Sequence, residues 1–230
     1  MTQSIVDVAA VSHIRGSGAA RIEVLRDVDL TLSPATLVVL AGRSGSGKST
    51  LCHLIAGVMP PTAGRVLVAG RPAHPAPDWA AVSLLPQRLA LDPELAVAEN
   101  ILLPAGLRAG KESRRGAGNQ TRAGRGARDA GTGLLDRLGL TAIADRPARE
   151  SSLGEQQRTA LARALILGPA VAVLDEPTAH QDDEHVGMVL EALTAAVAAG
   201  TLVVVATHDQ RVIDIADVVV RLHCGRVDRG

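Results

Sequence analysis

Aromatic residues are almost absent from this sequence of 230 residues, which contains no Phe, no Tyr and a single Trp, Trp79. Its core must therefore be built from Leu, Val, Ile and Ala. Apolar residues still make up 47% of the chain. A chain of this length and apolar content can bury a large core without disulfides or a structural metal, so we predict one large domain.

The sequence also has only two cysteines and no formal net charge. The two cysteines, Cys52 and Cys224, lie far apart and form no zinc-binding or redox spacing, so we expect both to be reduced, semi-buried packing residues. Lys and Arg (24) balance Asp and Glu (24), which argues against a dedicated nucleic-acid binder.

Long apolar runs are missing as well. No run approaches the ~20 apolar residues that cross a bilayer, and the N-terminus has no basic region followed by an apolar stretch. We therefore expect a soluble, cytoplasmic protein.

A glycine-rich loop at residues 42–50, here called the phosphate loop, follows the apolar run 37–41 and precedes the helix-like segment 51–56. Its glycines allow the backbone amides to point at one ligand, and the following helix adds its positive end. Glycine-rich turns also occur without a ligand, but every fixed position of the nucleotide-binding pattern is present here. Lys48 would reach the terminal phosphates, and the Ser49 hydroxyl would bind Mg²⁺. The predicted ATP-binding residues of this loop are Gly42, Ser44, Gly45, Ser46, Gly47, Lys48, Ser49 and Thr50.

Hydrophobic patterning predicts an α/β fold. Alternation at 27–32 is typical of a strand with one wet face, beside which residues 5–11 can pair. Continuous apolar runs at 38–41, 171–174 and 202–206 predict buried parallel strands. Helical segments are expected to end at Gly168 and Gly200. We predict a P-loop NTPase core with a parallel sheet, an N-terminal antiparallel β layer and an inserted helical subdomain.

The domain prediction is a single ATP-binding domain over 1–230. Its core comprises 1–87 and 160–230, and helical signals at 97–103 and 134–139 place the helical subdomain at 88–159. Within it, 108–133 is rich in Gly, Ala and Arg, with seven basic residues and two acidic ones, so we expect a mobile stretch. A solvated loop is one interpretation of this stretch, and a contact with phosphate headgroups or RNA is the other.

Two carboxylates follow the apolar run 171–174. In a parallel sheet they would lie at the same edge as the phosphate loop, although two acids at a strand end can also be ordinary loop residues. Asp175 is predicted to hold Mg²⁺, and Glu176 to act as a general base worth ~10²–10⁴ in rate.

With these elements in order, the sequence resembles the ATP-binding subunits of ABC transporters over nearly its whole length. Gln87 stands in the family's Q-loop, 175–178 in its Walker B motif, and Thr207, His208 and Asp209 in its switch segment. The resemblance implies that Gln87 senses Mg²⁺ and the γ-phosphate, and that His208 contacts the γ-phosphate. It also implies that Asp182, in the D-loop segment 178–182, acts between subunits.

Residues 151–158, here called the signature segment, stand where the family usually has Leu-Ser-Gly-Gly-Gln or Leu-Ser-Gly-Gly-Glu. Ser152 and Gly154 match it, whereas Ser151 replaces the Leu and Leu153 replaces the first Gly. Ser152 and Glu155 also have the spacing of a helix capping box, and a capped helix N-terminus is an anion site, so both interpretations hold together. In the family this segment serves the ATP of the opposite subunit, which implies a homodimer or heterodimer. We expect Leu153 to slow hydrolysis or weaken pairing.

Two further departures concern the D-loop segment and the base. Ala179, His180 and Gln181 precede Asp182 where the family usually has Ser-Ala-Leu. No aromatic residue is available upstream of Arg21 to stack on adenine, so Arg15 is predicted to stack by its guanidinium plane.

The resemblance is greatest to the lipoprotein-release and macrolide-export branch. It implies an ATPase that powers a membrane transporter, with permease subunits as separate chains, docking near 88–95, and a peripheral position on the inner face of the membrane. No nucleic-acid partner is expected. One alternative is a soluble ABC ATPase acting on nucleic acid or ribosomes, supported by the basic stretch alone. The other is a degenerate subunit with little turnover, favoured by Leu153 but opposed by Glu176 and His208.

Overall fold

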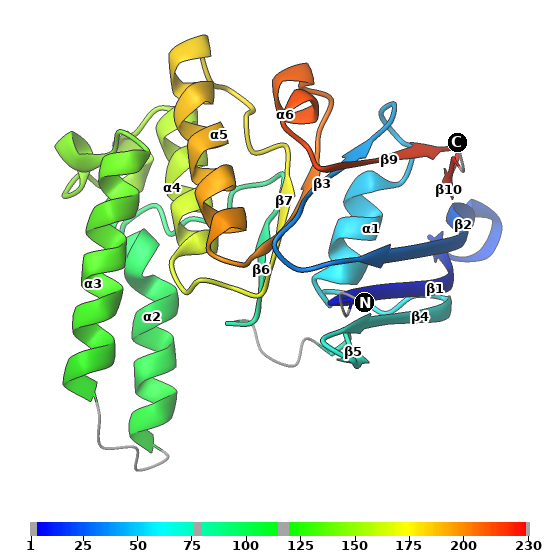
Figure 1. The fold of residues 1–230 in the computed structure, drawn as a ribbon, viewed down its shortest axis with the longest axis horizontal. Coiled ribbons are helices and arrows are strands. Elements are labelled where there is room, and N and C mark those ends of the chain that lie inside the picture. The colour runs from blue at the N-terminus through cyan, green and yellow to red at the C-terminus, as the bar shows by residue number, and fades with distance from the viewer. Residues whose placement is uncertain (1–3, 76–79, 115–119, 229–230) are drawn as a thin grey trace.

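The computed structural model describes residues 4–75, 80–114 and 120–228, which form two β-sheets and the helices around them (Figure 1). The strands are β1 (Val6–Arg15), β2 (Ile22–Leu32), β3 (Leu37–Ala41), β4 (Ala63–Val68), β5 (Arg71–Pro72), β6 (Val82–Leu85), β7 (Val171–Asp175), β8 (Leu202–Ala206), β9 (Val218–His223) and β10 (Arg226–Val227). The helices are α1 (Lys48–Ile55), α2 (Val97–Arg114), α3 (Gln120–Arg137), α4 (Leu153–Leu165), α5 (Asp183–Ala198) and α6 (Gln210–Asp214), with short 3-10 turns at Gly18–Ala20, Thr141–Ile143 and Ala148–Glu150.

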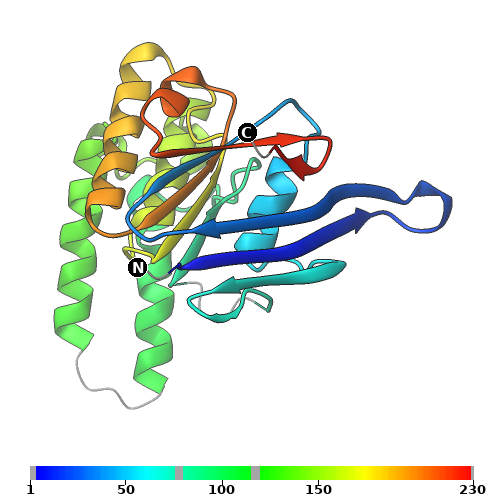
Figure 2. The ribbon, with the colours of Figure 1, turned by 45° about the vertical axis from the view of Figure 1, so that its right-hand side comes forward.

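The N-terminal sheet is antiparallel, with strand order β2-β1-β4-β5. The first two strands pair along most of their length, for example Val6 with Leu32 and Val8 with Leu30. The predicted pairing of 5–11 beside 27–32 is therefore confirmed. Figure 2 shows these two strands extending past the rest of the sheet as a long ribbon.

The central sheet has the order β10-β9-β3-β8-β7-β6, and all its strands are parallel except β10. The three predicted parallel strands are confirmed as β3, β7 and β8, in which every residue is buried. Successive side chains alternate between two cores: Val38 and Leu40 join the one that includes α1, and Val39 joins the one that includes α4 and α5. Continuous apolar runs were required because both faces of the sheet are covered.

Among the described residues, Leu and Ile supply all of the largest fully buried side chains, as expected for a sequence with so few aromatic residues. Both cysteines are free, as expected, but the expected half-burial was wrong. Cys52 is fully buried in α1, where desolvation raises the pKa of its thiol, whereas Cys224 is exposed. Cys52 is buried because the inner face of α1 lies between the two sheets (Figure 1), whereas Cys224 lies in the turn between β9 and β10.

Helices α2 and α3 lie side by side at one end of the molecule (Figure 1). They include 108–114 and 120–133, so the solvated-loop interpretation is wrong for these residues, and Arg115 lies outside the described residues. These helices form because Ala and Arg are strong helix formers, and because Leu102, Leu134 and Leu135 pack the helices onto the core. Helices α4 and α5 end before Gly168 and Gly200 as expected, with φ of +56° and +99° at these glycines. Within the described part of the chain, no helix is both long and apolar enough to span a bilayer.

Candidate functional site

The phosphate loop leaves the carboxyl end of β3 and turns directly into α1. Its tight path requires glycine at two positions. A Cβ on Gly42 (φ +154°) would lie 2.4 Å from the Leu222 carbonyl oxygen, and one on Gly47 (φ +107°) would lie 2.7 Å from the Leu25 side chain. Neighbouring strands thus fix the loop. The Lys48 ammonium folds back over it and donates to the carbonyl oxygens of Gly42 (2.7 Å) and Arg43 (3.2 Å).

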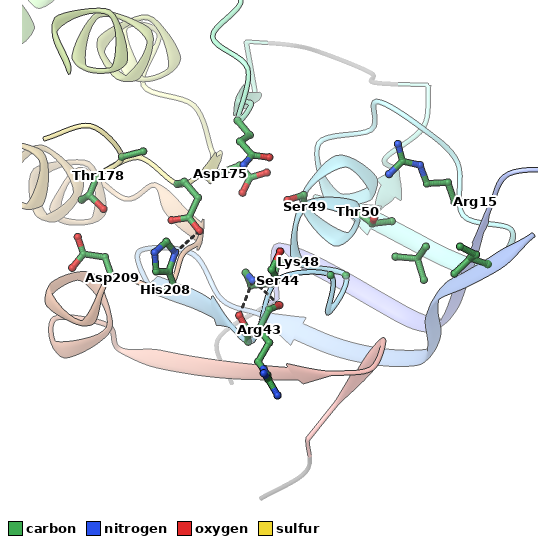
Figure 3. Close-up of a pocket in the computed structure, with 18 of the residues that line it drawn as sticks. Arg15, Arg43, Ser44, Lys48, Ser49, Thr50, Asp175, Thr178, His208 and Asp209 are labelled. Atoms are coloured by element: carbon green, nitrogen blue, oxygen red, sulfur yellow. Dashed lines mark hydrogen bonds and ion pairs between the residues drawn. The ribbon is translucent and has the colours of Figure 1, made fainter. Parts of the chain in front are cut away.

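A cleft of about 1520 Å³ opens above this loop (Figure 3). Strands β3, β8 and β7 are neighbours in that order, so the segments after them reach the same edge of the sheet. The cleft brings together most of the residues predicted for the site. These are Arg15, Gly42, Ser44, Gly45, Gly47, Lys48, Ser49, Thr50, Gln87, Asp175, Glu176 and His208.

Ser46 is the exception within the phosphate loop. Its side chain is buried, its hydroxyl has no hydrogen-bond partner, and it does not line the cleft. Its amide donates to the carbonyl oxygen of Arg43, and its carbonyl accepts from the amide of Gly225. The Ser46 side chain therefore lies behind the loop.

Asp175 ends β7 and is 3% exposed. Burial raises the pKa of its carboxyl, a hydrogen bond from Ser49 opposes that rise, and the charge of Glu176 adds to it. Its buried Oδ2 has no hydrogen-bond partner. A carboxylate in this state, next to a serine hydroxyl, fits a hard cation such as Mg²⁺. No group of three or more His, Cys, Asp or Glu side chains that could hold a metal occurs among the described residues, so phosphate and water oxygens would complete the coordination.

Glu176 is fixed through its backbone and its side chain. Its φ of +51° is unusual for a residue with a side chain. Its amide donates to the Ala206 carbonyl (2.8 Å) and its carbonyl accepts from Gln157 Nε2 of α4 (2.9 Å). One carboxylate oxygen accepts from the Thr207 hydroxyl (2.8 Å), and the other lies 2.9 Å from His208 Nδ1.

The structure adds residues to which sequence reasoning gave no role. Gln157 lies behind Glu176, and Thr207 orients the Glu176 carboxylate. Arg211 also lines the cleft and binds both Asp209 and Asp183, linking the switch segment to the start of α5. The order of the motifs holds no signal for these contacts, since they join α4, β8 and α6 across the fold.

Among the described residues that line the cleft, none is Phe, Tyr or Trp. Arg15, at the end of β1, pairs with Ile22 on β2, and both line the cleft. Ile22 is 67% exposed, so an apolar side chain is available beside the guanidinium. Figure 3 shows Arg15 on the side of the phosphate loop opposite His208.

The residues predicted to bind the ATP of a second subunit lie elsewhere. Ser152, Gly154, Glu155 and Asp182 are not in the wall of this cleft. Ser152 caps α4, its hydroxyl accepting from the Glu155 amide while the Glu155 carboxylate accepts from the Ser152 amide. The predicted capping box is therefore confirmed, and Leu153 beside it is 58% exposed. Asp182 is exposed and caps α5, where the hydrogen bond from the His185 amide lowers the pKa of its carboxyl.

Comparison with known proteins agrees with this geometry. Residues 25–179 match the model of a family described as ABC transporter. The chain is 36% identical to the macrolide export ATP-binding/permease protein MacB of Rhodopseudomonas palustris over 96% of its length, and spans 34% of that protein. It is 34% identical to the ABC transporter ATP-binding protein YtrE of Bacillus subtilis, covering 98% of both chains. It is also 34% identical to the lipoprotein-releasing system ATP-binding protein LolD of Xanthomonas oryzae, over 97% of this chain and 90% of that protein.

The fold is likewise similar to solved structures. One is described as a dimeric post-hydrolysis state of the ATP-binding cassette MJ0796 bound to ADP and Pi, with a TM-score of 0.84, 28% identity and 97% of each chain covered. The chain spans about a third of the length of the macrolide-export relatives.

Proposed function

This chain belongs to the ABC transporter family as an ATP-binding domain, and from this membership we propose that it hydrolyses ATP with Mg²⁺ in a head-to-tail dimer that powers a membrane transporter. The observation that carries the proposal is the cleft itself. The phosphate loop, Asp175, Glu176 and His208 line one cavity although they are distant in the sequence.

Residues of this cleft have distinct roles in the proposed reaction. The phosphate-loop amides and Lys48 hold the β- and γ-phosphates, and phosphate oxygens replace the two carbonyls that Lys48 now contacts. Glu176 takes a proton from the attacking water, the bond to the γ-phosphorus forms opposite the leaving ADP oxygen, and ADP and phosphate result. His208 contacts the γ-phosphate and Gln87 senses it. Ser49, Gln87 and Asp175 would hold Mg²⁺, which neutralises charge on the phosphate oxygens.

Arg15 is proposed to contact the base, with Ile22 beside it. The two side chains are paired across β1 and β2 and both line the cleft. An arginine plane next to an apolar side chain offers a stacking surface where an aromatic residue is missing.

We further propose that a second subunit completes each site. Ser152, Gly154 and Glu155 stand at the capped N-terminus of α4, where an anion is favoured, yet they lie outside the chain's own cleft. A partner's ATP is the ligand that fits them, with Asp182 in the contact between subunits. The dimeric state given for the similar cassette MJ0796 supports this arrangement.

The membrane partner is proposed to be a permease in separate chains, as the names and lengths of the LolD and YtrE relatives support. This chain would then lie peripherally on the cytoplasmic face of the membrane, acting as one ATP-binding domain whose helical subdomain, 88–159, receives the permease. The segment 88–95 presents a fixed surface, because the buried Asn100 amide bonds to Asp92 and Leu95, and Arg163 bonds to Ala90.

Substitution of the proposed base tests the function. We expect Glu176→Gln to lower phosphate release by ~10²–10⁴ while ATP binding, measured by calorimetry, is retained. Removal of Mg²⁺ with EDTA should abolish phosphate release by the unsubstituted protein. Equal phosphate release by the two proteins would contradict hydrolysis at this site and favour a subunit with little turnover.

A further inference from the structure

The D-loop segment packs directly on the first turn of α4. At Gly154 a Cβ would lie 2.8 Å from the backbone oxygen of His180, so no side chain fits between the two segments. His180 has a φ of +62°, which turns the chain towards α4 at this point. The signature segment and the D-loop segment of one molecule are therefore in backbone contact.

Gln181 joins these two segments through both ends of its amide. Its Nε2 donates to the Gly154 carbonyl (2.9 Å), and its Oε1 accepts from Nη1 of Arg158 (2.6 Å). Arg158 is 5% exposed and also donates from Nε to the Leu138 carbonyl (2.9 Å). A buried guanidinium needs acceptors for its N–H groups, and Gln181 provides one of them.

Position 181 departs from the family pattern that the chain resembles, because it is Gln here and usually Leu in the family. A leucine side chain has no polar atom, so it makes neither of these bonds. Gln181 also contacts the chain next to Leu153, another position that departs from the family pattern, because Gly154, whose carbonyl accepts from Gln181, directly follows Leu153. One hydrogen bond of Gln181 thus holds the backbone immediately after Leu153.

We propose that Gln181 is a positioning residue: it ties the signature segment to the D-loop segment and so holds Ser152 and Gly154 in the arrangement that binds the partner's ATP. The inference rests on the proposed function, since a second subunit must use these residues. The Gln181 side chain is not in the wall of the chain's own cleft, so it acts on pairing and turnover and leaves the first contact with ATP unchanged.

The residue that follows the D-loop segment, Asp183 at the start of α5, is also tied to the switch segment. Asp183 accepts from Arg211 (2.6 Å), and Arg211 holds the Asp209 carboxylate, next to His208. The D-loop segment therefore connects the γ-phosphate side of the chain's own cleft with the signature segment used by the partner. Gln181 makes the contacts of this connection with the signature segment, through Gly154 and Arg158.

Hydrogen exchange in the monomer tests the positioning directly. Gln181→Leu should speed exchange of the amides of Glu155 and Gln156 about tenfold, whereas Gln210→Leu on exposed α6 should leave them unchanged. Gln181→Glu keeps the acceptor for Arg158 and loses the donor to Gly154, so it should fall between the unsubstituted protein and Gln181→Leu. Unchanged exchange in folded Gln181→Leu, with melting temperature as the check of folding, would overturn the proposal.

Pairing and turnover provide the functional measurement. In the Glu176→Gln background, Gln181→Leu should raise the protein concentration needed for ATP-driven dimers about tenfold, measured by light scattering. With Glu176 intact, kcat should fall about tenfold with KM within twofold. Equal kcat and pairing in the two proteins would also overturn the proposal. If the unsubstituted protein neither pairs nor hydrolyses ATP, the proposed function fails, while the exchange experiment still decides whether Gln181 positions the signature segment.

Discussion

Asp175 combines a cost to folding with a role in the site. Its carboxyl is 3% exposed and burial raises its pKa above the ordinary value of 3.8. A raised carboxyl pKa means that the folded state holds the proton more tightly than the unfolded state. The contribution of the Asp175 carboxyl to the free energy of unfolding is therefore fully present at low pH. It is lost as the pH rises from 3.8 through the pKa of the folded state. Ionisation of this buried carboxyl, as the pH rises, therefore destabilises the fold.

Replacement of this carboxylate should separate stability from function. We expect Asp175→Asn to raise the melting temperature at pH 7 by a few degrees, since ~1 kcal/mol corresponds to roughly 2–4 °C in a domain of this size. The same variant should lose Mg²⁺-dependent ATP affinity in calorimetry. At a pH near 3.8 the gain in melting temperature should shrink, and a gain that is equal at both pH values would show that charge burial is not its cause.

Helices α2 and α3 carry glycines that their conformation does not require. Gly106 and Gly110 lie inside α2 with open space where a Cβ would stand. Gly131 in α3 differs, because a Cβ there would lie 3.0 Å from a Leu102 methyl group. Glycine in a helix interior costs ~0.5–1 kcal/mol relative to alanine through the entropy of the unfolded chain.

These positions give a matched pair of predictions for the helical region. Gly106→Ala with Gly110→Ala should increase the free energy of unfolding by ~1–2 kcal/mol in urea denaturation. Gly131→Ala should gain less, since the Leu102 side chain must shift. A loss of stability in the double variant would mean that α2 is not an uninterrupted helix at these residues.

Pairing of two molecules depends on the exposed Leu153. This side chain is 58% exposed at the start of α4, where the family pattern has a glycine and a partner's nucleotide must approach the backbone. We expect Leu153→Gly to strengthen ATP-driven pairing in the Glu176→Gln background about tenfold, which corresponds to ~1.4 kcal/mol. Light scattering at several protein concentrations measures this effect, and unchanged pairing together with unchanged turnover would show that Leu153 does not obstruct the contact.

At the scale of the whole molecule, the sequence by itself determined strands β1, β2, β3, β7 and β8, the phosphate loop and the two acids at the end of β7. Continuous apolar runs specify strands buried on both faces, and the spacing of Gly42 to Thr50 specifies a loop that turns into a helix. Each of these signals is local, because it lies within a single short stretch of the sequence. The capping box at Ser152 and Glu155 is local in the same way, and the structure confirms it.

Tertiary structure alone decided which distant groups meet. The contacts of Gln157 with Glu176, Thr207 with Glu176, and Gln181 with Arg158 join residues 19, 31 and 23 positions apart. Packing of Leu102, Leu134 and Leu135 likewise placed helices where the composition of 108–133 indicated a loop. The physical reason is the same in each case: a hydrogen bond or a buried contact between distant segments depends on how strands and helices are ordered in space, and residue composition does not carry that order.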